Sequence, residues 1–157
     1  MTLTNRKAVV IIGGVRQDTS VSVPLECQFE DIKINSNNYY SGIGGSAARA
    51  AMIISRLNDT HVTLMCKGAK DGPGREFARE MKTAGVEYKP CMVSQFPLSV
   101  FFLKGAERFG VLCDSLDPAD DETRWTEYPV IDLSGCNAVY FDGRLPHAAL
   151  GHAKQAR

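Results

Sequence analysis

The feature that most constrains the fold is an uninterrupted apolar run, residues 8–12, that leads directly into Gly13 and Gly14. A strand with one solvated face alternates polar and apolar residues, whereas a strand buried on both faces is apolar throughout. The run AVVII is mostly β-branched and shows no alternation. It therefore predicts a strand over residues 7–12 of a parallel sheet that is covered on both faces.

The shortness of this run and the charge balance exclude several classes of protein. Five apolar residues are too few for a transmembrane helix or for the core of a signal peptide. The 18 Lys and Arg residues balance 18 Asp and Glu residues without a clustered basic face, which argues against a nucleic-acid or membrane partner. We therefore expect a cytoplasmic protein whose thiols, which form no C-x-x-C pair, are reduced and buried. The cysteines are Cys27, Cys66, Cys91, Cys113 and Cys136.

The rest of the chain alternates helical and extended patterns. Ser46 is the expected N-cap of a helix over residues 47–57, and a second helix follows the turn 71–74 and ends before Gly85. Further expected elements are strands at 62–66, 99–104, 108–113 and 138–141, exposed strands between 21 and 40, an acidic loop at 114–127 and a helix from 145. Strands that alternate with helices, plus a hairpin, indicate an α/β layer fold with an antiparallel appendage.

Two short motifs add chemistry to this framework. Residues 42–47 fit G-x-G-x-x-A, but the dinucleotide motif requires a buried strand before it, and the preceding residues are polar. A tight turn into a helix explains the same glycines, as does a backbone that a ligand approaches closely. Asp18 follows the first strand, at the edge where α/β sheets bind ligands, and it either accepts bonds from substrate hydroxyls or caps a turn.

Four segments together resemble the ribokinase/PfkB carbohydrate kinase family: Gly13-Gly-Val-Arg-Gln-Asp18, Gly44-Gly45-Ser-Ala-Ala-Arg49, Gly68-Ala-Lys-Asp-Gly-Pro-Gly74 and Lys82-Thr-Ala-Gly85-Val86. The match covers essentially all 157 residues. The segment Val139-Tyr-Phe-Asp-Gly143-Arg144 is most similar to the ketohexokinase-like branch and to plant-type members. The resemblance implies a ribokinase-like three-layer αβα sandwich with a small antiparallel β lid, in segments of about 19–41 and 95–114. Residues 1–157 would be the N-terminal part of one kinase domain, truncated before its catalytic half.

The resemblance also implies roles for residues of the expected pocket. Asp18 would hold sugar hydroxyls, while Gly44 and Gly45 would bring backbone amides to the substrate. Family members have Asn at the position of Arg49, and Arg offers donors but no acceptor. Arg49 therefore either favours an anionic substrate, such as a sugar phosphate or a sugar acid, or points outward and does not touch the sugar. Arg16 adds a second positive group near the pocket.

The resemblance has further implications for the nucleotide and the lid. Arg144 follows a strand end and would contact the nucleotide phosphates, or it is an ordinary loop residue. The lid, with Tyr39 and Tyr40, would close over the sugar and form a homodimer interface, as in many members. Phe101 and Phe102 must face opposite sides of a strand, one toward the core and one toward lid or partner. The three histidines lack metal-ligand spacing, so they are expected to be structural or exposed, and no metal site is expected.

Two functional hypotheses follow. In the family, the catalytic base and anion hole come from a later motif, Asp-Thr-x-Gly-Ala-Gly-Asp, which is not found here, so no catalytic residue is expected in this chain. The first hypothesis is the sugar-binding half of a kinase that transfers the ATP γ-phosphate to a hydroxyl of a sugar or sugar-like molecule, with ATP, Mg²⁺ and, in some relatives, K⁺ as cofactors. The alternative is a non-catalytic binding protein, degenerate or truncated.

Overall fold

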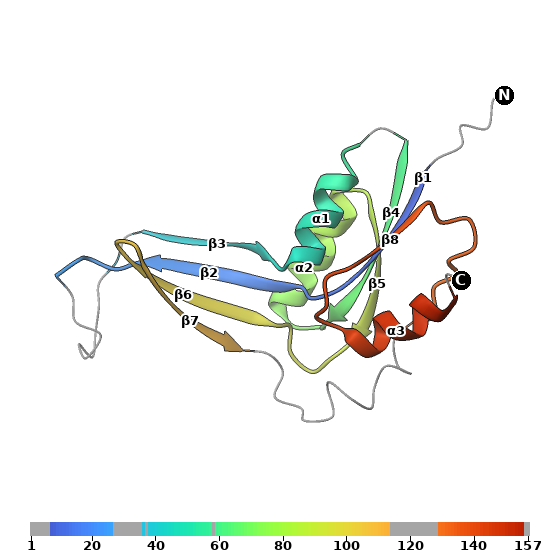
Figure 1. Ribbon diagram of the computed structural model, residues 1–157. Coiled ribbons are helices and arrows are strands. Elements are labelled where there is room, and N and C mark those ends of the chain that lie inside the picture. Colours follow the sequence, from blue (N-terminus) through green and yellow to red (C-terminus); the bar gives the residue numbers. More distant parts are fainter. Residues whose placement is uncertain (1–6, 27–35, 37, 58, 114–128, 156–157) are drawn as a thin grey trace.

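A four-stranded parallel sheet forms the centre of the molecule (Figure 1). The computed structural model describes residues 7–26, 36, 38–57, 59–113 and 129–155. In pairing order, the strands are β5 (Val86–Met92), β4 (Thr60–Gly68), β1 (Lys7–Ile12) and β8 (Ala138–Phe141). The predicted strands at 7–12, 62–66 and 138–141 are confirmed, and β1 has a parallel neighbour on each side.

Helices cover both faces of this sheet. They are α1 (Ser46–Ile54), α2 (Gly72–Thr83) and α3 (Pro146–Gln155). Helices α1 and α2 lie on one face and α3 lies on the other (Figure 1). Strand residues alternate accordingly, because Ile11 packs in the core with α1 and α2 whereas Val10 and Ile12 pack in the core with α3. The predicted αβα sandwich is therefore confirmed.

A second sheet, which we call the lid, extends away from the sandwich (Figure 1). Its strands, in pairing order, are β3 (Tyr39–Gly44), β2 (Arg16–Ser22), β6 (Leu98–Lys104) and β7 (Glu107–Cys113). The predicted hairpin of β6 and β7 is confirmed. Strands β2 and β6 pair in parallel, however, so the lid is mixed and not purely antiparallel. The reason is that both strands leave the sandwich at the junction and run outward.

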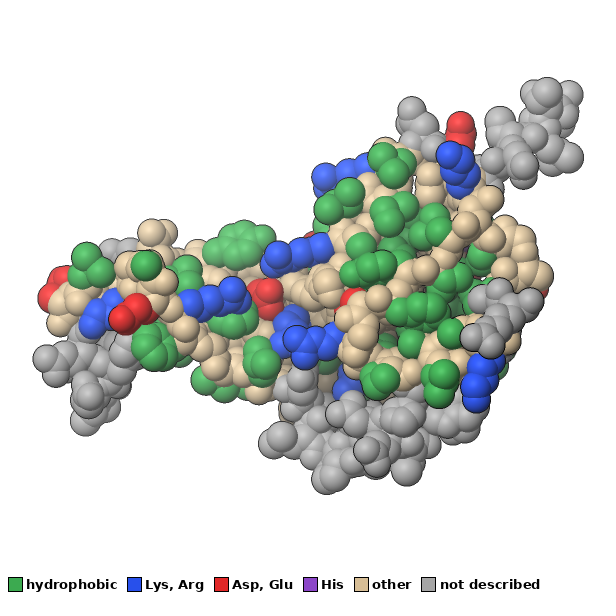
Figure 2. All heavy atoms as spheres, viewed as in Figure 1, with side chains coloured by type: hydrophobic (Ala, Val, Ile, Leu, Met, Phe, Trp, Pro, Cys, Tyr) green, Lys and Arg blue, Asp and Glu red, His purple; other side chains and the backbone are tan. Residues whose placement is uncertain are grey.

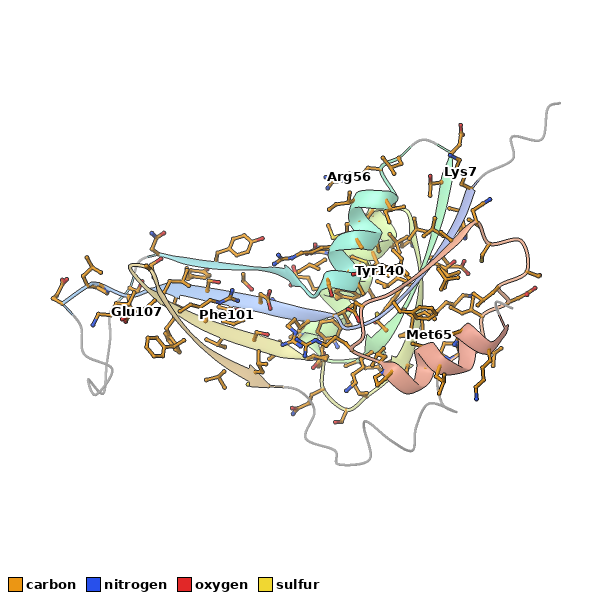
Figure 3. All side chains as sticks on the ribbon, in the orientation of Figure 1. Lys7, Arg56, Met65, Phe101, Glu107 and Tyr140 are labelled. Carbon is orange, nitrogen blue, oxygen red and sulfur yellow. The ribbon has the colours of Figure 1, made fainter. Side chains whose placement is uncertain are left out.

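The two faces of the lid differ in character. One face, which we call the apolar lid face, presents side chains of every strand: Tyr39, Val21, Val100, Phe102, Phe109 and Val111. The opposite face carries Asp18, Ser99 and Phe101, whose ring lies 3.6 Å from the guanidinium carbon of Arg108 (Figure 3). Phe101 and Phe102 thus face opposite sides as predicted, but both are half-buried within the lid and neither packs against the buried cores.

Three local expectations are wrong. Helix α1 begins at Ser46 itself, Gly45 is the cap residue, and no side chain caps the helix. No strand is among the expected elements where β5 lies; β5 contains Pro90 and is an edge strand, where a missing backbone N–H is tolerated. Cys113 is exposed because it lies at the end of the outer lid strand, whereas Cys66 and Cys91 are buried as expected.

Other details agree with the sequence. Asp71 is the N-cap of α2 and accepts a hydrogen bond from the Gly74 N–H, and Gly85 has a φ of +74° just past the end of that helix. His152 is buried and accepts a hydrogen bond from the Ile131 N–H, and His61 is exposed. The acidic segment 114–127 and Cys27 lie outside the described residues. None of the described helices has the length and apolar character that crossing a membrane requires.

Candidate functional site

The candidate site lies where the lid joins the sandwich. Strand β1 ends at Ile12, and the three residues 13–15 lead straight into β2 of the lid. Strand β3 returns from the lid and passes through Gly45 into α1. This junction adjoins the C-terminal ends of β1 and β8, the edge at which open α/β sheets bind ligands (Figure 1).

Only one of the two carboxylate oxygens of Asp18 has a partner at this junction, within the described part of the chain. Its Oδ2 lies 3.5 Å from Nη2 of Arg49, whereas its Oδ1 is buried and has no hydrogen-bond partner in the described part of the chain. The carboxylate lies directly against the backbone of Gly44, where an added Cβ would be 2.2 Å from the carboxyl carbon. Because buried acceptors are normally paired, Oδ1 is placed to receive a donor.

Arg49 reaches Asp18 from α1, but its side chain is 63% exposed while that of Asp18 is 16% exposed. An exposed ion pair of this length contributes about 0–1 kcal/mol, so Arg49 can exchange its partner at little cost. Arg49 is thus largely exposed, and its guanidinium contacts one oxygen of Asp18. The guanidinium remains accessible to a ligand.

A small cavity of about 90 Å³ lies at the same junction. Its lining includes Gly14, Arg16, Gly45 and Arg144, which come from three separate segments of the chain. Arg16 is anchored by a hydrogen bond of 3.2 Å from Nη1 to Ser99 Oγ, and the stem of Arg144 packs against Gly14. Ligand sites usually measure roughly 300–1,000 Å³, so this cavity has room for only part of a substrate.

Asp142 is a site residue that the sequence patterns did not single out. Its Oδ2 accepts hydrogen bonds from the Gly14 N–H (2.9 Å) and from Ser46 Oγ (2.7 Å), and its Oδ1 accepts one from the Arg144 N–H (2.9 Å). A carboxylate therefore already faces the start of α1 and complements the positive end of the helix dipole. Its place just past a parallel strand is the signal that could have identified it.

Two larger cavities flank the lid strands near the junction. One of about 250 Å³ is lined by Arg16, Glu76 and Phe77, among others, and one of about 400 Å³ by Tyr40, Arg49 and Glu80, among others. Figure 2 shows Lys and Arg side chains gathered at this junction beside acidic ones. The junction is thus charged and of both signs, as expected for polar ligands.

The described residues offer neither a reactive thiol at Cys66 nor a cluster of metal ligands. Burial raises the pKa of the Cys66 thiol well above its ordinary value, and the charge of Asp142 adds to this effect. The thiol therefore stays protonated and is a poor nucleophile. Within the described residues, no three or more His, Cys, Asp or Glu side chains are grouped so that they could hold a metal ion.

The glycine cluster differs from the expectation in one respect. A strand, β3, continues through Gly42 to Gly44, past residue 40, where the expected exposed strands end. It is an edge strand of the lid, not a strand of the parallel sheet, and Asp142 faces the helix start that follows. The dinucleotide motif requires the opposite arrangement, a parallel strand leading to a helix start that binds phosphate. The geometry therefore does not support a dinucleotide site.

Comparison with known proteins supports this view of the fold. No protein-family model matches the chain, and no curated protein matches it either. A nucleoside kinase of the ribokinase family from Methanocaldococcus jannaschii superposes with a TM-score of 0.71 at 17% identity, over 96% of this chain and 49% of that one. For a ribokinase from Thermotoga maritima, the TM-score is 0.70 at 13% identity, over 95% and 50%.

A ribokinase from Cryptococcus neoformans var. grubii, solved in complex with ADP, superposes with a TM-score of 0.66 at 17% identity, over 96% of this chain and 45% of that one. The chain thus spans about half the length of these kinases. At such identities the likeness concerns the fold alone. The sandwich, the lid and their junction together show that the chain has the ribokinase-like fold.

Proposed function

We propose that this chain is the substrate-binding half of an ATP-dependent carbohydrate kinase, which transfers the γ-phosphate of ATP to a hydroxyl of a sugar or sugar-like molecule. Its own residues would bind and orient the acceptor. Asp18 would accept a substrate hydroxyl, Gly44 and Gly45 would let the substrate approach the backbone, and Arg16 and Arg49 would border the pocket. The whole protein's activity is part of the proposal, because the chain covers about half of the kinases that share its fold.

The observation that carries the proposal is the unpaired, buried Oδ1 of Asp18. Leaving a buried acceptor without a donor costs about 1–3 kcal/mol, which a ligand can recover. A hydroxyl supplies the missing donor, and a polyol supplies it next to other hydroxyls that can meet the surrounding polar groups. This supports a sugar-like ligand at the lid junction.

The phosphate donor is inferred from a protein of the same fold. The Cryptococcus ribokinase was solved with ADP, which supports ATP as the donor. We propose that Arg144, at the end of β8, contacts the nucleotide phosphates, and that the segment Asp142-Gly143-Arg144 places the protein near the ketohexokinase-like or plant-type branch. By its resemblance to the family, the whole enzyme would use Mg²⁺ with ATP and, as in some relatives, K⁺.

We also propose that the protein forms a homodimer through the apolar lid face. Three of its side chains are strongly exposed, namely Tyr39 at 74%, Val111 at 56% and Phe109 at 47%. Exposed apolar patches of this kind mark interaction sites. The opposite lid face carries Asp18, so a partner on the apolar lid face would leave the substrate side accessible.

The test of the proposed function is a binding panel on the full-length protein. Isothermal titration with neutral sugars, sugar acids and sugar phosphates should identify a ligand, and Asp18→Ala should abolish its binding while ATP binding persists. Asp132→Asn, at an exposed loop carboxylate, is the matched control and should bind as wild type. Unchanged sugar affinity in Asp18→Ala would remove Asp18 from the site.

A second candidate, a non-catalytic binding protein, is favoured by the contact between Arg49 and Asp18 Oδ2. In that case the Asp18 carboxylate is paired within the protein and does not bind the hydroxyl group that a kinase would phosphorylate. Measurement of ATP consumption in the presence of a bound sugar separates the two functions. Turnover supports the kinase, and binding without turnover supports the second candidate. If the wild-type protein prefers anionic ligands and Arg49→Asn abolishes that preference, Arg49 contacts the substrate.

A further inference from the structure

The cavity of about 250 Å³, which we call the back cavity, lies between the base of the lid and α2, beside which the lid leaves the sandwich (Figure 1). On the lid side it is lined by Gln17 of β2 and by Ser41 and Ile43 of β3. Successive side chains of a strand point to opposite faces, so Gln17 and Thr19 point away from the face of Asp18. Ile43 pairs with Gln17 and Ser41 with Thr19, so they share that face. The back cavity therefore lies on the lid face opposite to that of Asp18.

The inner wall of the back cavity is apolar. Phe77 of α2 and Phe96, which precedes β6, both line it and are each 2% exposed. Their ring centroids lie 4.9 Å apart, and Ile43 packs against the same buried core. Packed aromatic rings form a fixed surface that gains free energy when an apolar group covers it. This wall is therefore suited to an apolar ring or a short apolar chain.

The rim of the back cavity on α2 is acidic. Glu76 and Glu80 both line the cavity and are four residues apart, so they lie on one side of the helix. Glu80 is half-buried, and its carboxylate has no hydrogen-bond or ion-pair partner among the described residues. Glu76 pairs with Arg79 at 3.2 Å, but both side chains are more than half exposed, so that pair is weak. A cation can therefore bind Glu80 without displacing another group.

The remaining polar groups of the back cavity do not oppose a cation. The basic residue among the described lining residues is Arg16, but its Nη1 donates a hydrogen bond to Ser99 Oγ, which lies on the lid face of Asp18. On the cavity side, Gln17 Nε2 donates a hydrogen bond of 3.0 Å to Ser41 Oγ. This bond leaves the amide oxygen of Gln17 able to accept a hydrogen bond from a ligand. The cavity thus offers acceptors and negative charge beside an apolar wall.

We propose that the back cavity binds a small organic cation, an ammonium group carried on an apolar ring or short chain. The apolar part lies on Phe77 and Phe96, and the ammonium group donates a hydrogen bond to the carboxylate of Glu80 at the rim. Ordinary ligand sites measure roughly 300–1,000 Å³, so a cavity of about 250 Å³ limits the ligand to a single ring or a chain of similar size. The inference goes beyond the proposed function and does not assume that Asp18 binds a sugar.

The experiment titrates phenethylamine, whose amine is protonated at neutral pH, into the full-length protein without sugar or ATP. We expect a Kd of about 1 mM or tighter. Hydrocinnamate has the same ring with the opposite charge, and methylamine has the charge without a ring, so both should bind much more weakly. Glu80→Gln keeps the size of the side chain and removes its charge, so the Kd of phenethylamine should rise about tenfold. Glu107→Gln, at the exposed turn between β6 and β7, is the matched control.

The isoleucine methyl spectrum of the same protein locates the bound amine. The aromatic ring of phenethylamine should shift the Ile43 methyl signal and leave that of Ile12, in the core with α3, unchanged. Equal binding of phenethylamine and hydrocinnamate, an unchanged Kd in Glu80→Gln or an unshifted Ile43 signal would each overturn the inference, as would no binding at about 10 mM. If Glu80→Gln does not fold, the three probes and the Ile43 signal still decide. Because no measurement uses a sugar, this inference and the proposed function fail separately.

Discussion

At the scale of single residues, the glycine at position 44 is required by the carboxylate beside it. Gly44→Ala would place a methyl group 2.2 Å from the carboxyl carbon of Asp18, and the carboxylate would have to move. We expect sugar affinity to fall about tenfold or more, with a small change in melting temperature because the displaced group is a side chain. Titration and a thermal melt measure the two effects.

The matched control is Gly72→Ala. A Cβ at this position, the first residue of α2, would meet no atom within 4 Å outside the neighbouring residues, so the sugar affinity should not change. Wild-type affinity in Gly44→Ala would mean that the Asp18 carboxylate does not bind the sugar from its present position.

The site residues were predictable to different degrees. Asp18, Gly44 and Gly45 lie close to the end of a strand or the start of a helix, and local sequence rules find such places. Asp142 acts through a contact with Gly14, 128 residues away, and no spacing in one sequence shows such a contact. Arg49 could be located on its helix but its partner could not, because side-chain direction depends on the packing of the lid.

At the scale of elements, a polar cluster joins β4 and β5. Glu87 lies 2.7 Å from Lys89 Nζ, 2.9 Å from His61 Nε2 and 3.0 Å from Thr63 Oγ1. Hydrogen bonds from Lys89, then His61 and Thr63, lower the pKa of Glu87 from 4.5 to about 2. A carboxylate whose pKa is lowered by folding stabilises the folded state above its unfolded pKa, and this contribution is lost as the pH falls toward the folded value.

We therefore expect Glu87→Gln to lower the melting temperature at neutral pH and to flatten its decline between pH 4.5 and about 2. Because Glu87 is 39% exposed, solvent screening keeps the effect modest. Circular-dichroism melts across this pH range measure it, with Glu76→Gln in an exposed pair on α2 as the control. An identical pH profile for wild type and Glu87→Gln would contradict the assignment.

The same elements show what periodicity can and cannot predict. The apolar runs of β1 and β4 indicate buried parallel strands because both faces are covered. Strand β5 carries exposed polar residues and Pro90, so its pattern resembles a loop, and only its pairing with β4 makes it a strand. The mixed pairing of the lid likewise follows from where β2 and β6 leave the sandwich, which the local pattern does not contain.

At the scale of the whole molecule, two features leave surface open to association. One is the apolar lid face, and the other is the outer edge of β8, whose backbone groups pair with no further strand in the described part of the chain. Tyr140 on that strand is 40% exposed (Figure 3). Unpaired edges and exposed apolar faces promote association.

We therefore expect the 157 residues, expressed by themselves, to be oligomeric or poorly soluble. Light scattering after size exclusion measures this. The double substitution Phe109→Glu and Val111→Glu should abolish the association that occurs through the apolar lid face. Leu112→Glu, on the other face of β7, is the control. A monodisperse monomer with a cooperative melt would contradict the expectation.

Because the connections between the lid and the sandwich are short, a rotation at these connections would move the far end of the lid more than the residues near the junction. Strand β2 has 7 residues and at roughly 3.3 Å each reaches about 23 Å from the junction, so a rotation of about 10° at residues 13–15 and at Gly45 would move its tip by about 4 Å. Asp18 is only the third residue of that strand and would move by about 2 Å. A partner that held the tip would therefore shift Asp18 by about half of the distance through which the tip moves.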